Sequence, residues 1–464
     1  MSSLHSVKKI IKDRIHEGSV VVEGWVRFVR KSKQFCFVVF NDGSTQDNMQ
    51  IVVDASLSNY AEISKMINGT SISVLGDLRV SEGKGQAVEL DAKEFTIVGH
   101  VEADYPLQKK ATSLEFLREN AHLRARTQLF GAVFRVKNAL SYATHRFFQE
   151  QDFYWIHTPI LTASDCEGAG EMFRVSTLDP KNPPLDDKGE IDYTKDYFGA
   201  PTHLTVSGQL NVECFSMGLN KVYTFGPTFR AENSHTHRHL SEFWMIEPEI
   251  AFAGLDEVAD LAIEYMKYLI NYCLSHCPKE LEFIEKRESP GLVERLQGVV
   301  TSEVVKITYT KAIEILEAAH AKENFEFAPK WGIDLQTEHE RYLTEGFHQG
   351  PVIVTDYPKD IKAFYMKLSD DGKTVRAMDV LVPGIGAIIG GSQREEKLDT
   401  LKKRIKEMNL SESDYWWYLD LRKYGTAPHG GFGLGFERMV QYVTGLHNIR
   451  DVMAFPRVQG NAKF

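Results

Sequence analysis

Two arginines stand where the sequence predicts phosphate chemistry. Arg230 ends the strand-like run VYTFGPTFR, and Arg438 follows the glycine-rich run GGFGLG at the start of an apolar helix. A planar guanidinium can bind phosphate oxygens in pairs, and the dipole at a helix start also favours anions. The alternative for Arg230 is a structural salt bridge to one of the nearby glutamates, Glu232, Glu242 or Glu247. Neither arginine defines a site alone.

The segments around these arginines predict the elements that position them. A polar loop containing Arg238 and His239 separates the first strand from a second, EFWMIEPEIAF. The alternating glycines before Arg438 fit neither Rossmann nor P-loop spacing, but they let the backbone approach a flat ligand. A long amphipathic helix is predicted over residues 127–149, followed by a strand-like run that stops at Pro159. Strands interspersed with helices indicate an antiparallel sheet with flanking helices, an α+β fold.

The N-terminal region has a different pattern. From about residue 19 to residue 100, short apolar runs alternate with turns, which predicts a small β-barrel. Phe35 and Phe37 share one face of a strand. They belong either to the barrel core or to an exposed surface that stacks on an unpaired base, with Arg27, Arg30 and Gln50 nearby. The basic residues between positions 8 and 33 are likewise either a solvated face or a phosphate-binding surface.

Composition limits the partners and the compartment. With 464 residues, 43% of them hydrophobic, and a formal net charge of -10, the chain is expected to be globular and not a general nucleic-acid coat. Five scattered cysteines suit free thiols in a reducing cytoplasm. Cys273, His276 and Cys277 are either metal ligands or an ordinary helix end, because no second pair follows at zinc-finger spacing. No secretion signal or membrane span is predicted, and neither DNA nor a membrane is expected as a partner.

Taken together, the segment ending at Pro159 and the two arginine segments resemble, in order and spacing, the three signature motifs of class II aminoacyl-tRNA synthetases. The barrel resembles the N-terminal anticodon-binding OB-fold of the aspartate, asparagine and lysine subgroup. Several segments are similar to those of the bacterial asparaginyl enzymes: SDCEGAGEMF, LTVSGQLNVE, VTDYPKDIKAFYMK, IIGGSQREE and RDVMAFPR. The resemblance implies an OB-fold over residues 1–102, a hinge over 103–125 and a class II catalytic domain over 126–464.

The resemblance also implies an activity. Such an enzyme activates L-asparagine with ATP and Mg²⁺ to asparaginyl-adenylate and transfers asparagine to the 3' end of tRNA-Asn, working as a homodimer. The implied ATP-binding residues are Arg230, Glu232, Arg238, His239, Gly435 and Arg438, with Arg230 and Arg438 as the catalytic pair. Those implied for the amino acid are Glu171, Gln209, Glu213 and Arg394, and for the anticodon Arg27, Arg30, Phe37 and Gln50.

One position departs from the family pattern. Asp379 fits the first member of an acidic pair that holds Mg²⁺, but the second position is Ala387, whose methyl group cannot coordinate a hard cation. The sequence therefore predicts ATP binding with slowed activation. Three alternatives stay open: a non-discriminating or aspartate-specific synthetase, an amide-forming relative that would not need the barrel, and a tRNA-binding relative with weakened catalysis.

Overall fold

The computed structural model describes residues 3–32, 34–81, 86, 88–107, 112–164, 172–233 and 236–464. The chain divides into two compact units, Met1–Ala132 and Val133–Phe464. Lys33, Cys166 and Glu171 lie outside the described residues. The predicted limits of the hinge, 103–125, stay a prediction.

The first unit is a closed β-barrel. Its strands are β1 (Ser3–Leu4), β2 (Gly18–Lys31), β3 (Phe35–Asn41), β4 (Met49–Asp54), β5 (Ser71–Val80) and β6 (Val88–Gly99). The sheet runs in the order β1-β2-β3-β4-β6-β5, and an additional pairing of β5 with β2 closes it. Short helices accompany it: α1 (Val7–Lys12), α2 (Tyr60–Ile63), α3 (Leu114–Glu119) and α4 (Ala121–Arg124). The barrel predicted from the sequence is confirmed.

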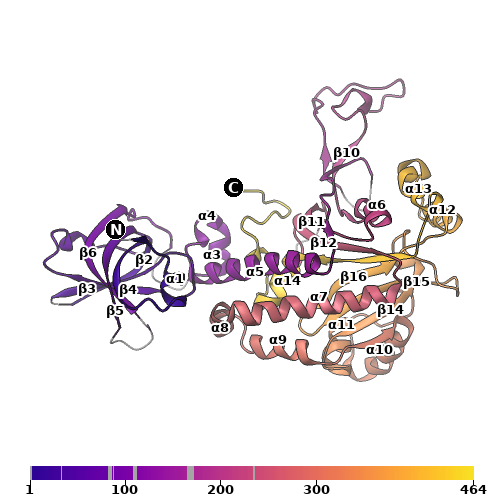
Figure 1. Cartoon of the computed structure of the whole chain (residues 1–464). Helices are drawn as coiled ribbons and strands as arrows, with labels where there is room; N and C mark the ends of the chain where they lie inside the picture. The colour runs from indigo at the N-terminus through magenta and orange to yellow at the C-terminus, as the bar shows by residue number, and fades with distance from the viewer. Residues whose placement is uncertain are drawn as a thin grey trace. The chain divides into compact units, whose positions relative to one another are not determined.

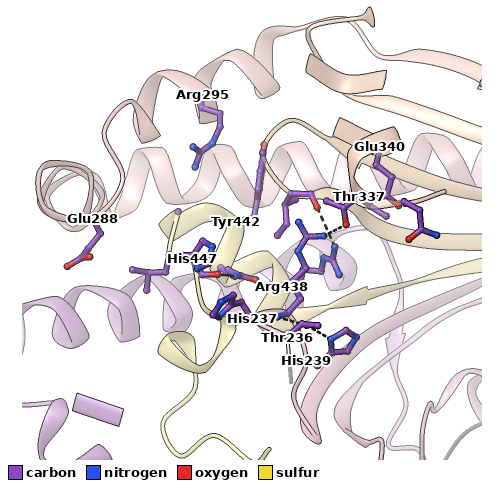
Figure 2. A pocket seen from close by; sticks show the side chains of 18 of the residues that line it. Thr236, His237, His239, Glu288, Arg295, Thr337, Glu340, Arg438, Tyr442 and His447 are labelled. Atoms are coloured by element: carbon purple, nitrogen blue, oxygen red, sulfur yellow. Dashed lines mark hydrogen bonds between the residues drawn. The ribbon is translucent and has the colours of Figure 1, made fainter. Parts of the chain in front are cut away.

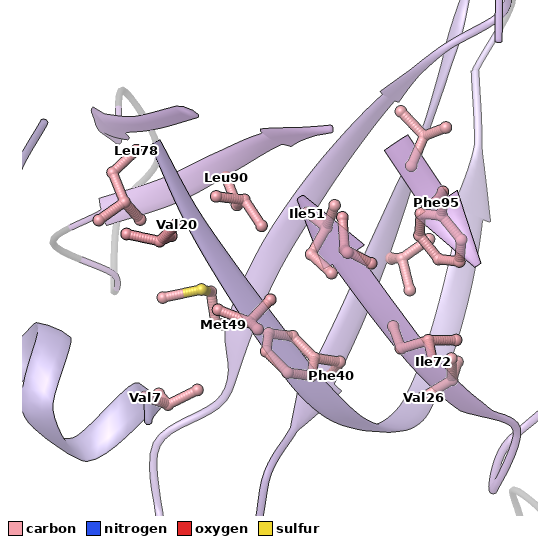
Figure 3. Close-up of a cluster of buried hydrophobic side chains, with 14 of the residues drawn as sticks. Val7, Val20, Val26, Phe40, Met49, Ile51, Ile72, Leu78, Leu90 and Phe95 are labelled. Atoms are coloured by element: carbon pink, nitrogen blue, oxygen red, sulfur yellow. The ribbon is translucent and has the colours of Figure 1, made fainter. Parts of the chain in front are cut away.

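Strand alternation decides which side chains fill this barrel. Cys36, Val38 and Phe40 of β3 point inward and are fully buried, whereas Phe35 and Phe37 alternate with them and are only half-buried. Figure 3 shows the interior, where Phe40, Met49 and Ile51 pack together with the other buried apolar residues. The interpretation that Phe35 and Phe37 belong to the barrel core is therefore wrong.

The second unit is built on a mostly antiparallel sheet. Its strand order is β13-β14-β15-β16-β17-β12-β11-β7, and only the β13–β14 and β7–β11 pairs are parallel. The strands are β7 (Tyr154–Trp155), β11 (Lys221–Phe229), β12 (Glu242–Ala251), β13 (Val305–Thr308), β14 (Val352–Pro358), β15 (Thr374–Val382), β16 (Gly386–Gln393) and β17 (His429–Gly435). A smaller sheet joins β8 (Leu161–Thr162), β9 (Arg174–Val175) and β10 (Thr202–Leu204).

Helices cover both faces of the large sheet. Figure 1 shows α7 (Leu255–His276) on one face and α6 (Gln209–Leu219) on the other; α7 packs on β15, β16 and β17, and α6 on β11 and β12. The remaining helices are α5 (Gln128–Glu150), α8 (Pro278–Arg287), α9 (Leu292–Thr301), α10 (Tyr309–Glu323), α11 (Thr337–Arg341), α12 (Leu398–Glu407), α13 (Trp416–Lys423) and α14 (Phe436–Thr444). The predicted α+β architecture is confirmed, and the helix expected over 127–149 is α5.

One glycine explains the close contact at the centre of the sheet. A Cβ on Gly431 of β17 would overlap the backbone oxygen of Pro248 in β12 and would meet the carboxylate of Glu249. The glycine therefore lets β17 pack tightly against the neighbouring strand, and this packing, rather than ligand contact, accounts for one of the alternating glycines.

Two further findings concern the cysteines and membranes. Cys36, Cys214, Cys273 and Cys277 are free thiols. His276 lies against the backbone oxygen of Tyr272 at the end of α7, and the described ranges contain no group of three or more His, Cys, Asp or Glu side chains that could hold a metal ion. Across the same ranges, no helix combines the length and apolar character needed to cross a bilayer.

Candidate functional site

A cavity of about 280 Å³ collects the six residues predicted to bind ATP. It is lined by Arg230, Glu232, Arg238, His239, Gly435 and Arg438, together with Phe243 and Met245. Arg230 follows β11, and Arg438 lies in the first turn of α14, directly after β17. Because β12 separates β11 from β17 in the sheet, the two arginines come from opposite sides of one strand.

Contacts inside this cavity orient its charged groups. The guanidinium of Arg230 lies 5.3 Å from the centre of the Phe243 ring. His239 is 3.8 Å from the carboxylate of Glu232, and Arg238 donates to the hydroxyl of Thr337 at 2.9 Å. An aromatic face beside several cations suits a ligand that combines a flat base with phosphates.

A larger cavity of about 850 Å³ continues from the first and shares Arg238, His239 and Arg438 with it. Figure 2 shows Arg438, His239 and Glu340 around this space. Burial and the neighbouring charge of Arg238 lower the pKa of Arg438, whereas Glu340 opposes that shift. The charged form of a buried guanidinium that lies near a second cation should be stabilised when an anionic ligand binds beside it.

Glu340 of α11 lies beside Ala387, the position that departs from the family pattern. Its Oε2 accepts the backbone N–H of Ala387 at 3.0 Å, and both residues line the larger cavity. Burial raises the pKa of Glu340, and the negative charge of Asp379 acts in the same direction. A carboxylate thus lies against the backbone of Ala387, but it comes from α11 and not from the strand on which the sequence placed the missing one.

Asp379, on β15, is held by another partner. Its Oδ2 accepts from Nζ of Lys362 at 2.8 Å, and the side chain is only 20% exposed. No cluster of three metal-binding side chains occurs among the described residues. The metal-binding role predicted for Asp379 stays a prediction.

Three of the residues predicted for the amino acid form a second, buried group. Gln209 and Arg394 both donate to Oε1 of Glu249, with Nε of Arg394 at 2.9 Å. Arg394 also donates to Ser392 at 2.7 Å. Burial raises the pKa of Glu249, and the negative charge of Glu213 adds to this shift. The guanidinium of Arg394 is therefore fixed by groups at both of its ends.

Glu213 lies one helical turn after Gln209 on α6 and belongs to the same group. Its Oε1 accepts from Arg422 at 2.7 Å and contacts His429 Nε2 at 2.6 Å, while Oε2 accepts from Tyr418 at 2.7 Å. Burial acts to raise the pKa of Glu213, but the charges of Arg422 and His429 hold it at about 2. The carboxylate is therefore ionised at neutral pH.

Three of the four residues predicted for the anticodon meet on the outside of the barrel. The Arg30 guanidinium lies 5.3 Å from the centre of the Phe37 ring and donates to Oε1 of Gln50 at 3.5 Å. The amide nitrogen of Gln50 donates to Glu89 at 2.8 Å. Arg27 instead donates to the backbone oxygen of Arg126, so its guanidinium binds the segment that follows α4.

Sequence reasoning missed four residues that the structure adds to these groups: Glu340, Tyr418, Arg422 and His429. Only His429, directly before the glycine run, carried a local signal. The others come from helices whose charged residues look like solvated faces. The predicted ammonium-binding residue, Glu171, lies outside the described residues.

Comparisons with known proteins agree with this arrangement. Residues 113–459 match the model of tRNA synthetases class II (D, K and N), and residues 20–98 match that of an OB-fold nucleic acid binding domain. The asparagine–tRNA ligase of Clostridium beijerinckii is 58% identical over 96% of both chains, and that of Alkaliphilus oremlandii is 57% identical over 96% of both. The crystal structure of Pyrococcus horikoshii asparaginyl-tRNA synthetase with asparaginyl-adenylate superposes with a TM-score of 0.84 at 32% identity and covers 97% of each chain.

The matched family model extends over both arginine segments, and the barrel matches a nucleic-acid-binding module of its own. The chain belongs to the class II tRNA synthetases of the D, K and N group.

Proposed function

We propose that this chain is an asparagine–tRNA ligase that forms asparaginyl-adenylate from L-asparagine and ATP and then charges tRNA-Asn. The observation that carries the proposal is the pairing of a cation-rich cavity, lined by Arg230 and Arg438, with a buried group around Glu213 and Arg394. Relatives that are more than half identical over nearly the whole chain are asparagine–tRNA ligases, which supports the same substrate here.

The first step needs positioning and charge more than a general base. The carboxylate of asparagine is already ionised, and one of its oxygens attacks the α-phosphorus of ATP while pyrophosphate leaves. Arg230 neutralises charge on the α-phosphate, Arg238 and His239 bind the terminal phosphates, and Arg438 lies against the adenine and the γ-phosphate. Glu232, beside His239, and Gly435, before α14, complete the nucleotide wall.

In the second step the terminal ribose hydroxyl of tRNA attacks the carbonyl carbon of the mixed anhydride. The new ester bond forms as the bond to AMP breaks, and the phosphate of the leaving AMP takes the hydroxyl proton. This chain contributes orientation and positive charge from Arg230 to that step.

Selection of asparagine over aspartate depends on the charge near the side chain. Arg394 points to the side-chain carbonyl oxygen, and the ionised carboxylate of Glu213 accepts a hydrogen bond from the amide nitrogen. A substrate carboxylate would offer no donor and would be repelled. Gln209, which donates to Glu249, belongs to the same amino-acid group, and Glu171 binds the ammonium group.

Mg²⁺ would supply charge neutralisation at the ATP phosphates, and the donor chemistry of the site allows it to bind. Asp379 and Glu340 both offer the carboxylate oxygens that this ion prefers, and their charges interact. Ala387 offers none. Lys362 already pairs with Asp379, so binding of the ion at Asp379 competes with an existing ion pair.

The barrel supplies tRNA recognition. A base can stack on the half-buried Phe37, while Gln50 reads a base edge and Arg30 and Arg27 add positive charge. Free thiols at Cys36, Cys214, Cys273 and Cys277 agree with a reducing cytoplasm.

A homodimer would cover the edge of the large sheet. Tyr154 and Trp155 of the edge strand β7 are 59% and 50% exposed, and a cavity of about 800 Å³ beside them is lined by aromatic residues that include Phe225, Trp244 and Phe436. Exposed aromatic groups of this size are typical of protein interfaces.

Exchange of radioactive pyrophosphate into ATP tests the proposal. We expect asparagine to support exchange and aspartate to give less than about a hundredth of that rate at equal concentration. Equal rates with both would favour a non-discriminating enzyme, and exchange with aspartate alone would contradict the proposal.

A further inference from the structure

The larger cavity, of about 850 Å³, extends beyond the residues predicted to bind ATP. Arg238, His239 and Arg438 line both this cavity and the smaller one of about 280 Å³. The distal part of the larger cavity is lined by Glu288, Arg295, Gly384, Gln441, Tyr442 and His447. Figure 2 shows Arg295 and Tyr442 on the walls of this distal part. The contacts proposed for ATP do not use it.

Arg295, on α9, is placed in the distal part by packing. Its guanidinium lies 6.0 Å from the centre of the Tyr442 ring. Its Cδ and Nε lie 3.8 and 3.9 Å from the position that a Cβ would take on Gly384, so the side chain runs alongside that residue. Among the described residues, no side chain forms a hydrogen bond or an ion pair with its guanidinium. The charge of Arg295 is therefore held at the cavity wall without a partner.

The carboxylates near Arg295 are bound by other cations. Both oxygens of Glu345, whose charge interacts with Arg295, accept from Arg341 at 3.0 and 3.1 Å. Glu288 accepts from Nε of Arg287 at 2.8 Å. The walls of the whole cavity carry three arginines against two glutamates, so the cavity favours an anion.

The turn between β15 and β16 connects Arg295 with the nucleotide end of the cavity. Gly384 of this turn lies against Arg295, and the backbone oxygen of the next residue, Ile385, accepts from Nη2 of Arg438 at 3.5 Å. Arg438 and Tyr442 are one helical turn apart on α14, about 6 Å along its axis, and therefore lie on the same face. An anion can thus move from Arg438 to Arg295 without leaving the cavity.

Cleavage of ATP releases an anion at the nucleotide end. The bond between the α-phosphorus and the bridging oxygen breaks, and its electron pair stays on the pyrophosphate. The product therefore carries more negative charge than the same two phosphates carried in ATP, and it is no longer tethered to the nucleoside. A guanidinium without a partner in the same cavity would attract it, because arginine binds phosphate oxygens through charge-assisted hydrogen bonds.

We propose that Arg295 anchors a second phosphate site, in the distal part of the larger cavity, which binds pyrophosphate after ATP has been cleaved and before the product leaves. This rests on the proposed cleavage of ATP beside Arg230 and Arg438, and it does not depend on which amino acid is activated. Arg295 binds the product and does not touch the reacting phosphorus.

The test uses inorganic pyrophosphate as the probe, with the full chain and at constant Mg²⁺. Isothermal titration calorimetry without ATP or amino acid gives the Kd for pyrophosphate, and exchange with asparagine gives the KM values for pyrophosphate and for ATP. Arg295→Gln removes the charge, and Arg295→Lys keeps it without the planar fork. Arg376→Gln is the matched control, because Arg376 is also partly exposed but is not among the residues lining this cavity. Thermal unfolding shows whether each variant keeps its fold.

For Arg295→Gln we expect the Kd and the KM for pyrophosphate each to rise by about tenfold or more, because a charged donor to the anion is lost. The KM for ATP should stay within about twofold of the wild-type value, since ATP does not reach this site. Arg295→Lys should give intermediate values for pyrophosphate. Arg376→Gln should leave all three constants unchanged.

Unchanged affinity for pyrophosphate in folded Arg295→Gln would overturn the proposal. A parallel rise in the KM for ATP would also overturn it, because Arg295 would then contact the terminal phosphate of bound ATP. If Arg295→Gln does not fold, the same measurements on Arg295→Lys decide. Calorimetry uses no amino acid, so it tests the site even if the wild type fails to activate asparagine, a failure that would refute only the proposed function.

Discussion

The amino-acid group and the nucleotide cavity handle charge in opposite ways. Around Glu213 and Glu249, each carboxylate contacts a buried guanidinium, from Arg422 and Arg394, and the group is closed to solvent. In the nucleotide cavity, the nearby charge of Arg238 contributes to lowering the pKa of the buried Arg438. The first region is preorganised by its own ion pairs. In the second region, the positive charge of the arginines is neutralised when an anionic ligand binds.

The largest effect should therefore come from removing a cation of the cavity. We expect Arg438→Ala and Arg230→Ala each to lower kcat/KM for pyrophosphate exchange by about 100- to 1000-fold, because charge on the phosphates in the transition state loses a fixed partner. Lys286→Ala, which removes an exposed lysine paired with Glu282, is the control. A loss below tenfold would mean that the cavity does not hold the reacting phosphates.

A smaller but more selective loss is expected in the amino-acid group. Glu213→Gln keeps the size of the side chain but turns an acceptor-only group into one that also donates. We expect kcat/KM for asparagine to fall by about 30- to 100-fold and that for aspartate to fall less. Glu280→Gln, which changes a nearly buried carboxylate paired with Arg135, is the matched control. Equal losses for both amino acids would contradict a role for Glu213 in choosing between asparagine and aspartate.

How far the sequence predicted these regions depends on whether their residues are close along the chain. The six residues of the nucleotide cavity that the sequence predicts to bind ATP come from two continuous segments, around Arg230 and around Gly435. The amino-acid group was predicted only in part, because Tyr418 and Arg422 reach Glu213 across sequence separations of 205 and 209 residues. Strand alternation placed Phe35 and Phe37 on one face correctly but did not reveal which face was inside.

Glu340 shows the same limit. Nothing in the local sequence links α11 to the start of β16, yet the carboxylate of Glu340 accepts the backbone N–H of Ala387 there. Sequence position identified the missing carboxylate at 387, but only the packing of α11 shows that the acidic side chain of Glu340 contacts this residue.

A change in the barrel should affect tRNA and leave activation intact. Phe37→Ala removes a stacking surface worth about 1–3 kcal/mol per base, so we expect KM for tRNA to rise about 5- to 100-fold, with pyrophosphate exchange unchanged. Phe28→Ala, at an exposed phenylalanine elsewhere on the barrel, should leave both values close to those of the wild type. An unchanged KM for Phe37→Ala would remove this residue from the anticodon surface.

Adding a carboxylate at position 387 should have a modest effect on the rate of activation. Ala387→Glu is expected to raise the rate of pyrophosphate exchange by roughly threefold or more at limiting Mg²⁺, because a second carboxylate would then lie near Asp379. Ala387→Gln, which adds similar bulk without charge, is the control. Equal rates for the wild type and for Ala387→Glu would show that a carboxylate at this position is dispensable here.

The smallest expected effect is on the pH dependence of stability, and it appears only in acid. The pKa of Glu213 is lowered from 4.5 to about 2 in the folded chain, so its ionised form stabilises the fold above its ordinary pKa. That contribution should be lost as the pH falls from about 4.5 towards 2. In urea unfolding, Glu213→Gln should weaken the loss of stability over this range, and a curve parallel to that of the wild type would contradict this assignment.

The central claim is that one chain joins asparagine to its tRNA through both regions. Charging of a tRNA-Asn transcript with labelled asparagine, with labelled aspartate in a parallel reaction, tests it most directly. We predict ester-linked asparagine on the tRNA and a signal from aspartate at the background level. Charging with aspartate, or adenylate formation without any transfer to the transcript, would contradict the account.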